Sequence, residues 1–318
     1  MLNDAEFVAM WQQFPSPSLF SEKAGISLRQ VYKRRAALVG RGFDLPTRED
    51  GLNNVVYKSG NGWTYPRQRN IEIENGSIIV SSDHHYWPDM VTVAHLALLE
   101  VHRIVKPVIS VKNGDILDGA KISRHPPFGF CDLPTVKDEL DACKERCEEI
   151  REAAGPDCKH YWNIGNHCVR FEKTLAMHAG EYAGINGFRL EHHFPHDEFQ
   201  WSLAVNWDSK QPVMIKHRLA GGVHAGYNNA MKGGVTMVTG HTHILEAKPY
   251  NDYNGRRWGI QTGTISDPQG PQMEYAENSP SQACAGFVVL TWKDGRLLPP
   301  EMCEVIDGRA YFRSEVVA

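Results

Sequence analysis

The sequence lacks several features that would assign it to a specialised class of proteins. Its seven cysteines form no Cys-x-x-Cys pair, and their odd number does not suit a disulfide framework. No stretch approaches the roughly 18 consecutive apolar residues of a membrane span. The first residues contain neither the basic nor the apolar region of a signal peptide. We therefore expect free thiols in a reducing cytoplasm.

The chain also has little net charge, −4 over 318 residues. This value argues against a protein that binds nucleic acid over its whole surface. The charge is uneven, however, because residues 1–70 hold ten basic and six acidic residues, and the remainder holds 24 basic and 32 acidic ones. A basic N-terminal part and an acidic body indicate two parts with different tasks.

The chain is long enough for one large domain and a small one. Helical patterning over residues 5–41 predicts a small helical module, which we place at 1–43. Residues 44–70 are rich in Gly, Asn, Pro and Arg, and we expect a linker there. In the remaining sequence, predicted strands first alternate with helices, and the C-terminal half is rich in strands. This pattern predicts a layered α/β domain over 71–318, with sheets covered by helices.

Local patterns predict individual elements of the large domain. Asn75-Gly76 between two apolar segments is the signal of a two-residue β-hairpin. Helices are expected over residues 90–105, 134–154 and 171–178. Strands are expected over residues 108–111, 160–164, 213–216 and 235–239.

Residues 18–38 of the helical module carry a more specific pattern. Gly25 interrupts an apolar helical face, and Ser27 with Gln30 has the spacing of a capping box that begins a second helix. The pattern resembles a helix-turn-helix, whose second helix enters the major groove of DNA. Four basic residues are candidate DNA contacts: Arg29, Lys33, Arg34 and Arg35. A solvated basic helix in a helical cap is the alternative, because the usual aliphatic residue three after Val31 is here an arginine.

Five short segments at or just past apolar runs hold the residues best suited to bind metal ions. They are Ser82-Asp83-His84-His85, Asn113-Gly114-Asp115, Gly165-Asn166-His167, Lys216-His217 and Gly240-His241-Thr242-His243. Side chains at strand ends gather in one crevice of an α/β sheet. Carboxylates, an amide and imidazoles suit two neighbouring divalent metal ions, and such a pair hydrolyses phosphate esters.

This series is similar, in content and order, to the motifs of the calcineurin-like metallophosphoesterase superfamily. The resemblance implies two packed β-sheets flanked by helices, and two divalent ions, Mn²⁺ first, with Fe or Zn²⁺ as alternatives. A hydroxide shared by the ions would attack phosphorus. The resemblance implies that the first ion is bound by Asp83, His85 and His243. Asp115 would bridge both ions, and the second ion would also be bound by Asn166, His217 and His241.

The resemblance also implies that His167 stabilises the transition state or protonates the leaving oxygen. The family often has an acid directly after this histidine, where the chain has Cys168, so His167 needs another hydrogen-bond partner. Asp118 matches an acid of the family that orients ligands, and we count it with the catalytic residues. The fourth motif leaves two candidates open, because His217 ends an apolar strand and His224 follows shortly after it.

Other polar residues have both a functional and an ordinary interpretation. Arg124 and His125 follow Asp118 closely and are candidate contacts to a substrate phosphate, or else an ordinary loop. The histidine-rich segment 191–197 could line a substrate channel or bind a metal ion, but a solvated loop is favoured. Four further histidines lie within helix or strand patterns and are expected to be structural: His95, His102, His160 and His178.

We predict a dimetal phosphoesterase that cleaves phosphodiesters in nucleic acid, with DNA as the expected partner. It resembles enzymes encoded by phages and prophages, which would place it in the cytoplasm of a bacterial host. GDILDGAK and GNHC, in place of GDxxDRG and GNHE, argue against a Ser/Thr phosphatase. A phosphomonoesterase or small-nucleotide hydrolase is the first alternative. A DNA-binding protein with a vestigial metal site is the second, and the complete ligand set argues against it.

Overall fold

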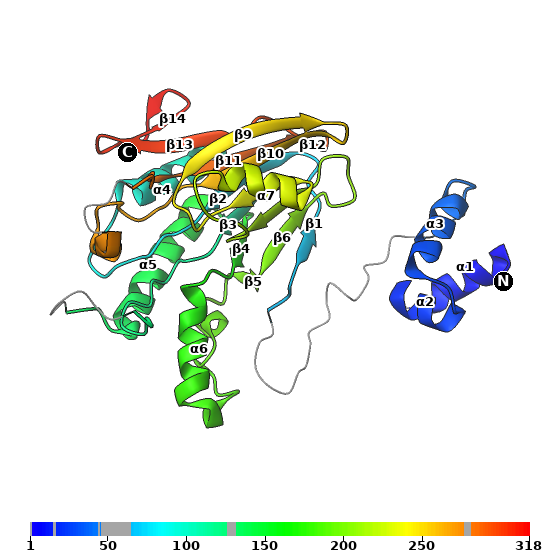
Figure 1. The fold of residues 1–318 in the computed structure, drawn as a ribbon, viewed down its shortest axis with the longest axis horizontal. Coiled ribbons are helices and arrows are strands. Elements are labelled where there is room, and N and C mark those ends of the chain that lie inside the picture. The colour runs from blue at the N-terminus through cyan, green and yellow to red at the C-terminus, as the bar shows by residue number, and fades with distance from the viewer. Residues whose placement is uncertain (1, 15–16, 44, 46–64, 126–131, 277–280) are drawn as a thin grey trace. The chain divides into compact units, whose positions relative to one another are not determined.

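The computed structural model describes most of the chain and divides it into two compact units, residues 1–66 and 67–318 (Figure 1). Each unit is considered by itself. The described residues are 2–14, 17–43, 45, 65–125, 132–276 and 281–318. None of the helices among them combines the length and the apolar character needed to cross a lipid bilayer.

The described residues of the N-terminal unit form three helices, α1 (Asp4–Gln13), α2 (Pro17–Ala24) and α3 (Leu28–Val39). Gly25, with a φ of +64°, provides the turn between α2 and α3. The expected capping box begins α3, because Gln30 donates its backbone N–H to the Ser27 hydroxyl and accepts one from the Ser27 backbone. The helices enclose a small core of Phe7, Trp11, Phe20, Val31, Leu38 and Leu45.

The described part of the large unit contains two β-sheets. The first is built from β1 (Arg69–Ile71), β6 (Ser202–Val205), β7 (Val213–Lys216), β8 (Thr236–Thr239), β9 (Leu245–Asp252) and β10 (Gly255–Thr262). The second is built from β2 (Gly76–Ser81), β3 (Ile109–Lys112), β4 (Lys159–Asn163), β5 (Glu198–Gln200), β11 (Gly286–Lys293), β12 (Arg296–Leu297), β13 (Glu301–Ile306), β14 (Arg309–Phe312) and β15 (Glu315–Val316). Their strand orders are β1-β6-β7-β8-β10-β9 and β15-β14-β13-β11-β2-β3-β4-β5, with β12 beside β11.

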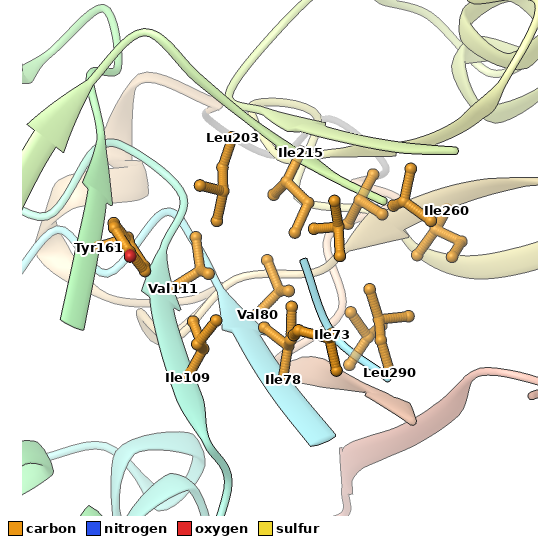
Figure 2. Close-up of a cluster of buried hydrophobic side chains, with 14 of the residues drawn as sticks. Ile73, Ile78, Val80, Ile109, Val111, Tyr161, Leu203, Ile215, Ile260 and Leu290 are labelled. Carbon is orange, nitrogen blue, oxygen red and sulfur yellow. The ribbon is translucent and has the colours of Figure 1, made fainter. Parts of the chain in front are cut away.

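The inner faces of the two sheets form the main core (Figure 2). Ile78 and Val80 of β2 point into it, as do Ile109 and Val111 of β3, because alternate residues of a strand share a face. Leu203, Ile215 and Ile260 of the first sheet pack against them. Full burial of one such side chain stabilises the fold by about 1.5–3 kcal/mol.

Helices cover the outer faces of this sandwich, which confirms the layered α/β fold expected from the sequence. Helix α4 (Val93–Val105) packs against β11, β13 and β14 and against α5 (Val136–Ala154). Helix α7 (Ala225–Gly233) packs against β8, β9 and β10 of the first sheet. Helix α6 (Cys168–His178) starts directly after the third motif and projects away from the sheets (Figure 1). Three short 3-10 helices also occur: η1 (Gly180–Tyr182), η2 (Leu190–His193) and η3 (Pro271–Ala276).

The prediction of a β-hairpin around Asn75-Gly76 is wrong. Strand β1 pairs in parallel with β6 of the first sheet, whereas β2 pairs with β3 and β11 of the second. Between them the Asn206 side chain accepts the N–H of Ile73 at 2.7 Å and donates to its carbonyl at 2.8 Å. The two apolar segments around Asn75-Gly76 therefore belong to a crossover between the two packed sheets. A crossover buries apolar residues on both sides of the turn, as a hairpin does, so the sequence pattern is the same for both.

The other predicted elements of the large unit are confirmed with small shifts at their ends. Strand β7 has the expected bounds, and α5 begins two residues later than expected, after its Thr135 N-cap. Helix α6 begins at Cys168, three residues before the expected start. Strand β1 begins at Arg69, within the segment expected to be a linker, of which residues 46–64 lie outside the described chain.

Candidate metal centre

The five motifs meet where strands of both sheets end. Strands β2, β3 and β4 run parallel, so the residues after them, Asp83, Asp115 and Asn166, follow neighbouring carboxyl ends. Strands β7 and β8 are also parallel, and His217 and His241 follow their ends. This arrangement places ligands from the two sheets around one crevice.

The described residues form three overlapping groups able to hold a metal ion. Within each group one ligand atom per residue lies within 4.8 Å of the others. The groups are Asp83-His85-His243, His85-Asp115-His167 and Asp115-His217-His241. Because neighbouring groups share His85 or Asp115, the ligand atoms form one continuous centre.

The first group contains buried polar atoms that the protein itself leaves unpaired. Asp83 is fully buried, and its Oδ1 lies 3.2 Å from His243 Nε2 and 4.0 Å from His85 Nε2. Neither Asp83 Oδ1 nor His85 Nε2 has a hydrogen-bond partner of normal geometry among the described residues. The other oxygen of Asp83 accepts the backbone N–H of His241 at 2.8 Å. An unpaired buried polar atom costs about 1–3 kcal/mol, and a cation between these atoms removes that cost.

The third group, with Asn166 beside it, brings several acceptors to one point. His217 donates Nδ1–H to the Asn113 carbonyl at 2.8 Å, which turns Nε2 toward the centre. That nitrogen lies 3.0 Å from Asp115 Oδ2 and 3.2 Å from Asn166 Oδ1. A carboxylate, an amide oxygen and an imidazole lone pair converge only around a proton or a metal cation. The donor set therefore fits a divalent ion.

Electrostatics hold a proton at this point when no cation is present. Burial opposes a charged imidazole, but Asp115 and Asp83 outweigh it and raise the pKa of His217 to about 9. A metal ion held by these residues would take the place of that proton, and its binding would release the proton to solvent. The alternative fourth ligand, His224, is exposed at the start of α7 and belongs to none of the three groups. The geometry favours His217.

Asp118 supplies the partner that Cys168 cannot supply. Its carboxylate accepts Nδ1–H of His85 at 2.8 Å and Nδ1–H of His167 at 3.0 Å. Burial raises the pKa of Asp118, but these two hydrogen bonds outweigh it and hold the pKa below its usual range. Burial also opposes charge on His167, yet Asp118 and Asp115 raise the pKa of that imidazole. One acid thus orients a metal ligand and the proposed catalytic histidine.

The backbone of the centre adopts a conformation that the sequence does not indicate. Five of the seven expected ligands have left-handed φ angles: Asp83 (+53°), His85 (+40°), Asp115 (+52°), His241 (+71°) and His243 (+59°). Asp and His tolerate this region better than most residues, but a sparsely populated conformation still costs of order 1–3 kcal/mol. Such strain persists where the surrounding fold enforces it, and here it turns the side chains toward the crevice.

Glycines allow the segments to approach closely. A Cβ atom at Gly165 would collide with the carboxylate and backbone of Asp115. A Cβ atom at Gly240 would collide with Ser82 and with the Asp83 carboxylate. The glycines that precede Asn166 and His241 in the motifs therefore leave space for ligands on neighbouring strands.

Several predicted site residues lie apart from the three groups. Arg124 and His125 are exposed, and the structure shows a contact between their side chains at 3.3 Å. Their contact with substrate stays a prediction. In the N-terminal unit Arg29 and Lys33 are exposed on α3, whereas Arg34 pairs with Asp4 at 3.1 Å. Arg35 donates two hydrogen bonds to the carbonyl of a core residue of that unit, Leu45.

The histidine-rich segment 191–197 is not a fully solvated loop. Phe194 is buried, and Asp197 accepts a hydrogen bond at 2.6 Å from the ammonium group of buried Lys112. The segment lines a cavity of about 310 Å³ that also contains His160. Lys112 and His160 alternate with core residues, so this cavity lies on the outer face of β3 and β4. None of its residues belongs to the three metal groups.

Sequence reasoning missed one residue beside His167. Arg170 Nη2 lies 3.2 Å from His167 Nε2. The signal was the spacing of three residues at the start of α6, which places two side chains on one helix face.

The chain is similar in sequence to two phage proteins. No protein-family model matches the chain. It is 26% identical over 188 residues to the Gene 54 protein of Mycobacterium phage L5, covering 55% of this chain and 72% of that protein. It is 26% identical over 167 residues to the Gene 54 protein of Mycobacterium phage D29, covering 49% and 64%.

Three solved structures resemble the chain. Zn²⁺-complexed Vps29 from Entamoeba histolytica has 13% identity and a TM-score of 0.40, covering 76% of this chain and 99% of that one. YfcE, a phosphoesterase from E. coli, has 17% identity and a TM-score of 0.34, covering 70% and 97%. A dimetal phosphatase from Danio rerio has 10% identity and a TM-score of 0.33, covering 73% and 96%.

The class of site follows from the chain's own residues. Its five motifs, its two packed sheets and its three ligand groups resemble those of a calcineurin-like metallophosphoesterase. Its relatives named above are phage proteins.

Proposed function

We propose that the protein is a metal-dependent phosphodiesterase that hydrolyses nucleic acid. The observation that carries this proposal is the continuous centre of buried carboxylates and imidazoles, in which Asp83 Oδ1 and His85 Nε2 lack hydrogen-bond partners among the described residues. Most buried polar atoms in proteins have hydrogen-bond partners. Their convergence without pairing supports binding of divalent cations.

The ligand residues would hold two cations, Mn²⁺ first, with Fe or Zn²⁺ as alternatives. Asp83, His85 and His243 would hold one, and Asn166, His217 and His241 the other, with Asp115 between them. When bound, such cations act as Lewis acids and lower the pKa of water at the site. Asp118 orients His85 and fixes His167 through its Nδ1 atom. This leaves His167 Nε2 to hold or donate a proton at the leaving oxygen.

One face of the N-terminal unit supports nucleic acid as the substrate. Arg29 and Lys33 lie one turn apart on α3, with the 40% exposed side chain of Tyr32 between them in sequence. A cationic helix face with an aromatic residue can contact phosphates and bases. The phage relatives support action in the cytoplasm of a bacterial host. The N-terminal unit would then bring an acidic catalytic body, which by itself repels DNA, to its substrate.

That acidic body also favours one rival, a phosphomonoesterase or small-nucleotide hydrolase. Residues 71–318 carry 32 acidic and 24 basic side chains, and a small anion tolerates such a surface better than a polymer does.

A panel of substrates distinguishes the two functions. The full chain, loaded with Mn²⁺, is incubated with single- and double-stranded DNA, RNA, and model phosphate mono- and diesters. We expect diester and nucleic-acid cleavage that Asp115→Asn abolishes and His224→Gln, the matched control outside the centre, leaves unchanged. Turnover of monoesters alone would establish the rival. No turnover of any ester with Mn²⁺, Fe²⁺ or Zn²⁺ would exclude both.

A further inference from the structure

Arg170 brings a guanidinium group to the side of the centre occupied by His167. It lies in the first turn of α6, three residues after His167, so both side chains share one helix face. Its Nη1 donates to the carbonyl of Asp118 at 2.9 Å and to that of Gly119 at 3.5 Å. Its Nη2 lies 3.2 Å from His167 Nε2. The side chain is 22% exposed and therefore accessible to a substrate.

The hydrogen bonds around His167 determine which atoms of His167 and Arg170 are donors and which are acceptors. His167 Nδ1 faces two acceptors, the carboxylate of Asp118 at 3.0 Å and its carbonyl at 2.9 Å. The proton of the neutral imidazole therefore lies on Nδ1, and the lone pair on Nε2 accepts an N–H from Arg170. Arg170 thus forms a hydrogen bond with Nε2, the atom of His167 that would face a leaving oxygen.

A phosphate that enters the centre needs a cationic partner, and Arg170 can be that partner. Three buried carboxylates, Asp83, Asp115 and Asp118, lie in or beside the centre and repel a phosphate. The guanidinium is held in place by backbone carbonyls, so it needs little reordering to receive an oxygen. An anionic oxygen is also a better acceptor for a guanidinium N–H than a neutral imidazole nitrogen, because charge-assisted hydrogen bonds are about twice as strong.

We infer that Arg170 binds a non-bridging oxygen of the substrate phosphate and exchanges its hydrogen bond to His167 Nε2 for one to that oxygen. The exchange frees Nε2 to take up a proton from solvent, which it can then donate to the leaving oxygen, only when substrate is present. This inference rests on the proposed phosphoesterase function and names the residue that recognises the phosphate. It differs from a bracing role, in which Arg170 would only fix the turn at Asp118 and Gly119.

Binding of inorganic phosphate to the Mn²⁺-loaded full chain tests the inference by calorimetry. For Arg170→Gln we expect the Kd for phosphate to rise about 10- to 100-fold, as for loss of a hydrogen bond to a charged group. Arg170→Lys keeps the charge but not the planar fork and should lie between the two. Lys173→Gln, at an exposed position one turn farther along α6, is the matched control and should bind phosphate normally.

Two further measurements separate the possible results. Mn²⁺ affinity, measured in the same calorimeter, should be equal in all variants, and KM for a model diester should rise in Arg170→Gln. Unchanged phosphate binding, or a loss of Mn²⁺ affinity that accounts for the whole effect, would overturn the inference. If Arg170→Gln does not fold, the lysine variant decides in the same way. Arg170-dependent phosphate binding without hydrolysis of any ester would contradict the proposed function and leave the inference standing.

Discussion

Buried histidines occur in two regions of this protein, behind the second sheet and at the strand ends, and their partners differ. On α4, His102 contacts the Leu98 carbonyl at 2.7 Å and the Ser110 hydroxyl at 2.9 Å, and His95 contacts Tyr86 and Glu149. At the strand ends, His85 is equally buried, but its Nε2 has no described partner. Burial is therefore common to both sets of histidines, and His85 differs from His95 and His102 in having a ring nitrogen without a partner among the described residues.

An unpaired nitrogen is not sufficient by itself. Both ring nitrogens of buried His160 also lack partners among the described residues. His160 nevertheless belongs to none of the groups of three possible ligands. The candidate ligand histidines are thus recognised by carboxylates or imidazoles of other segments that converge on a ring nitrogen, as Asp115 does on His217.

The largest effect in this comparison is expected at Asp115, which two ligand groups share. Asp115→Asn removes a charge that stabilises bound cations, whose contribution of several kcal/mol to the transition state corresponds to about 10³-fold in rate. Steady-state hydrolysis of a diester and metal content by atomic absorption measure the two losses. Metal content and rate equal to those of the unmodified protein would contradict a shared role for this carboxylate.

Behind the sheet, His102 is expected to affect stability and its pH dependence. Burial lowers the pKa of His102 to about 4 from its ordinary value near 6.5. Because the unfolded chain takes up the proton first, stability is complete above pH 6.5 and decreases as the pH falls toward 4. The loss is about 3 kcal/mol.

Urea unfolding at pH 7 and pH 4.5 measures this loss. His102→Gln should show a smaller decrease between the two pH values than the unmodified chain. His178→Gln, at an exposed position on α6, should behave like the unmodified chain. Parallel decreases in all three proteins would show that His102 does not titrate as its surroundings require.

Asp118 connects the centre to its support and should have a smaller effect than Asp115. Asp118→Asn keeps the shape but offers one acceptor oxygen where two histidines need partners, and loss of such support typically costs 10- to 100-fold in metal affinity or activity. Calorimetric titration with Mn²⁺ and diester kinetics measure both. A loss as large as that of Asp115→Asn would mean that Asp118 contacts a cation or the substrate directly.

The smallest effect is expected on DNA binding by the N-terminal unit. Arg29 and Lys33 are exposed there, whereas Arg34 and Arg35 are partly buried. The double variant Arg29→Gln/Lys33→Gln should lower the slope of log affinity against log salt by about 2, because each phosphate that is no longer neutralised reduces it by about 0.9. Fluorescence anisotropy with a labelled DNA duplex measures the slope. Lys210→Gln/Lys232→Gln removes the same charge from exposed positions in the large unit. Equal slopes for the two double variants would leave α3 without a role in DNA binding.

Local patterns were sufficient for part of this architecture. The capping box of α3, most strands and the ligands at strand ends depend on residues close together in sequence, so periodicity and spacing reveal them. The Asn75-Gly76 segment shows the limit, because a hairpin and a crossover bury the same apolar neighbours. Pairing with a strand more than 100 residues away decided between them.

The amino-acid sequence by itself determined which residues could bind metal ions and in which order they follow the strands. Only the tertiary structure decided that Asp118 replaces the acid missing at Cys168, that His217 rather than His224 faces the centre, and that Arg170 reaches His167. It also decided that Arg34 and Arg35 bind within their own unit. The physical reason is range: hydrogen-bond satisfaction depends on distances between atoms remote in sequence, and packing of the two sheets sets those distances.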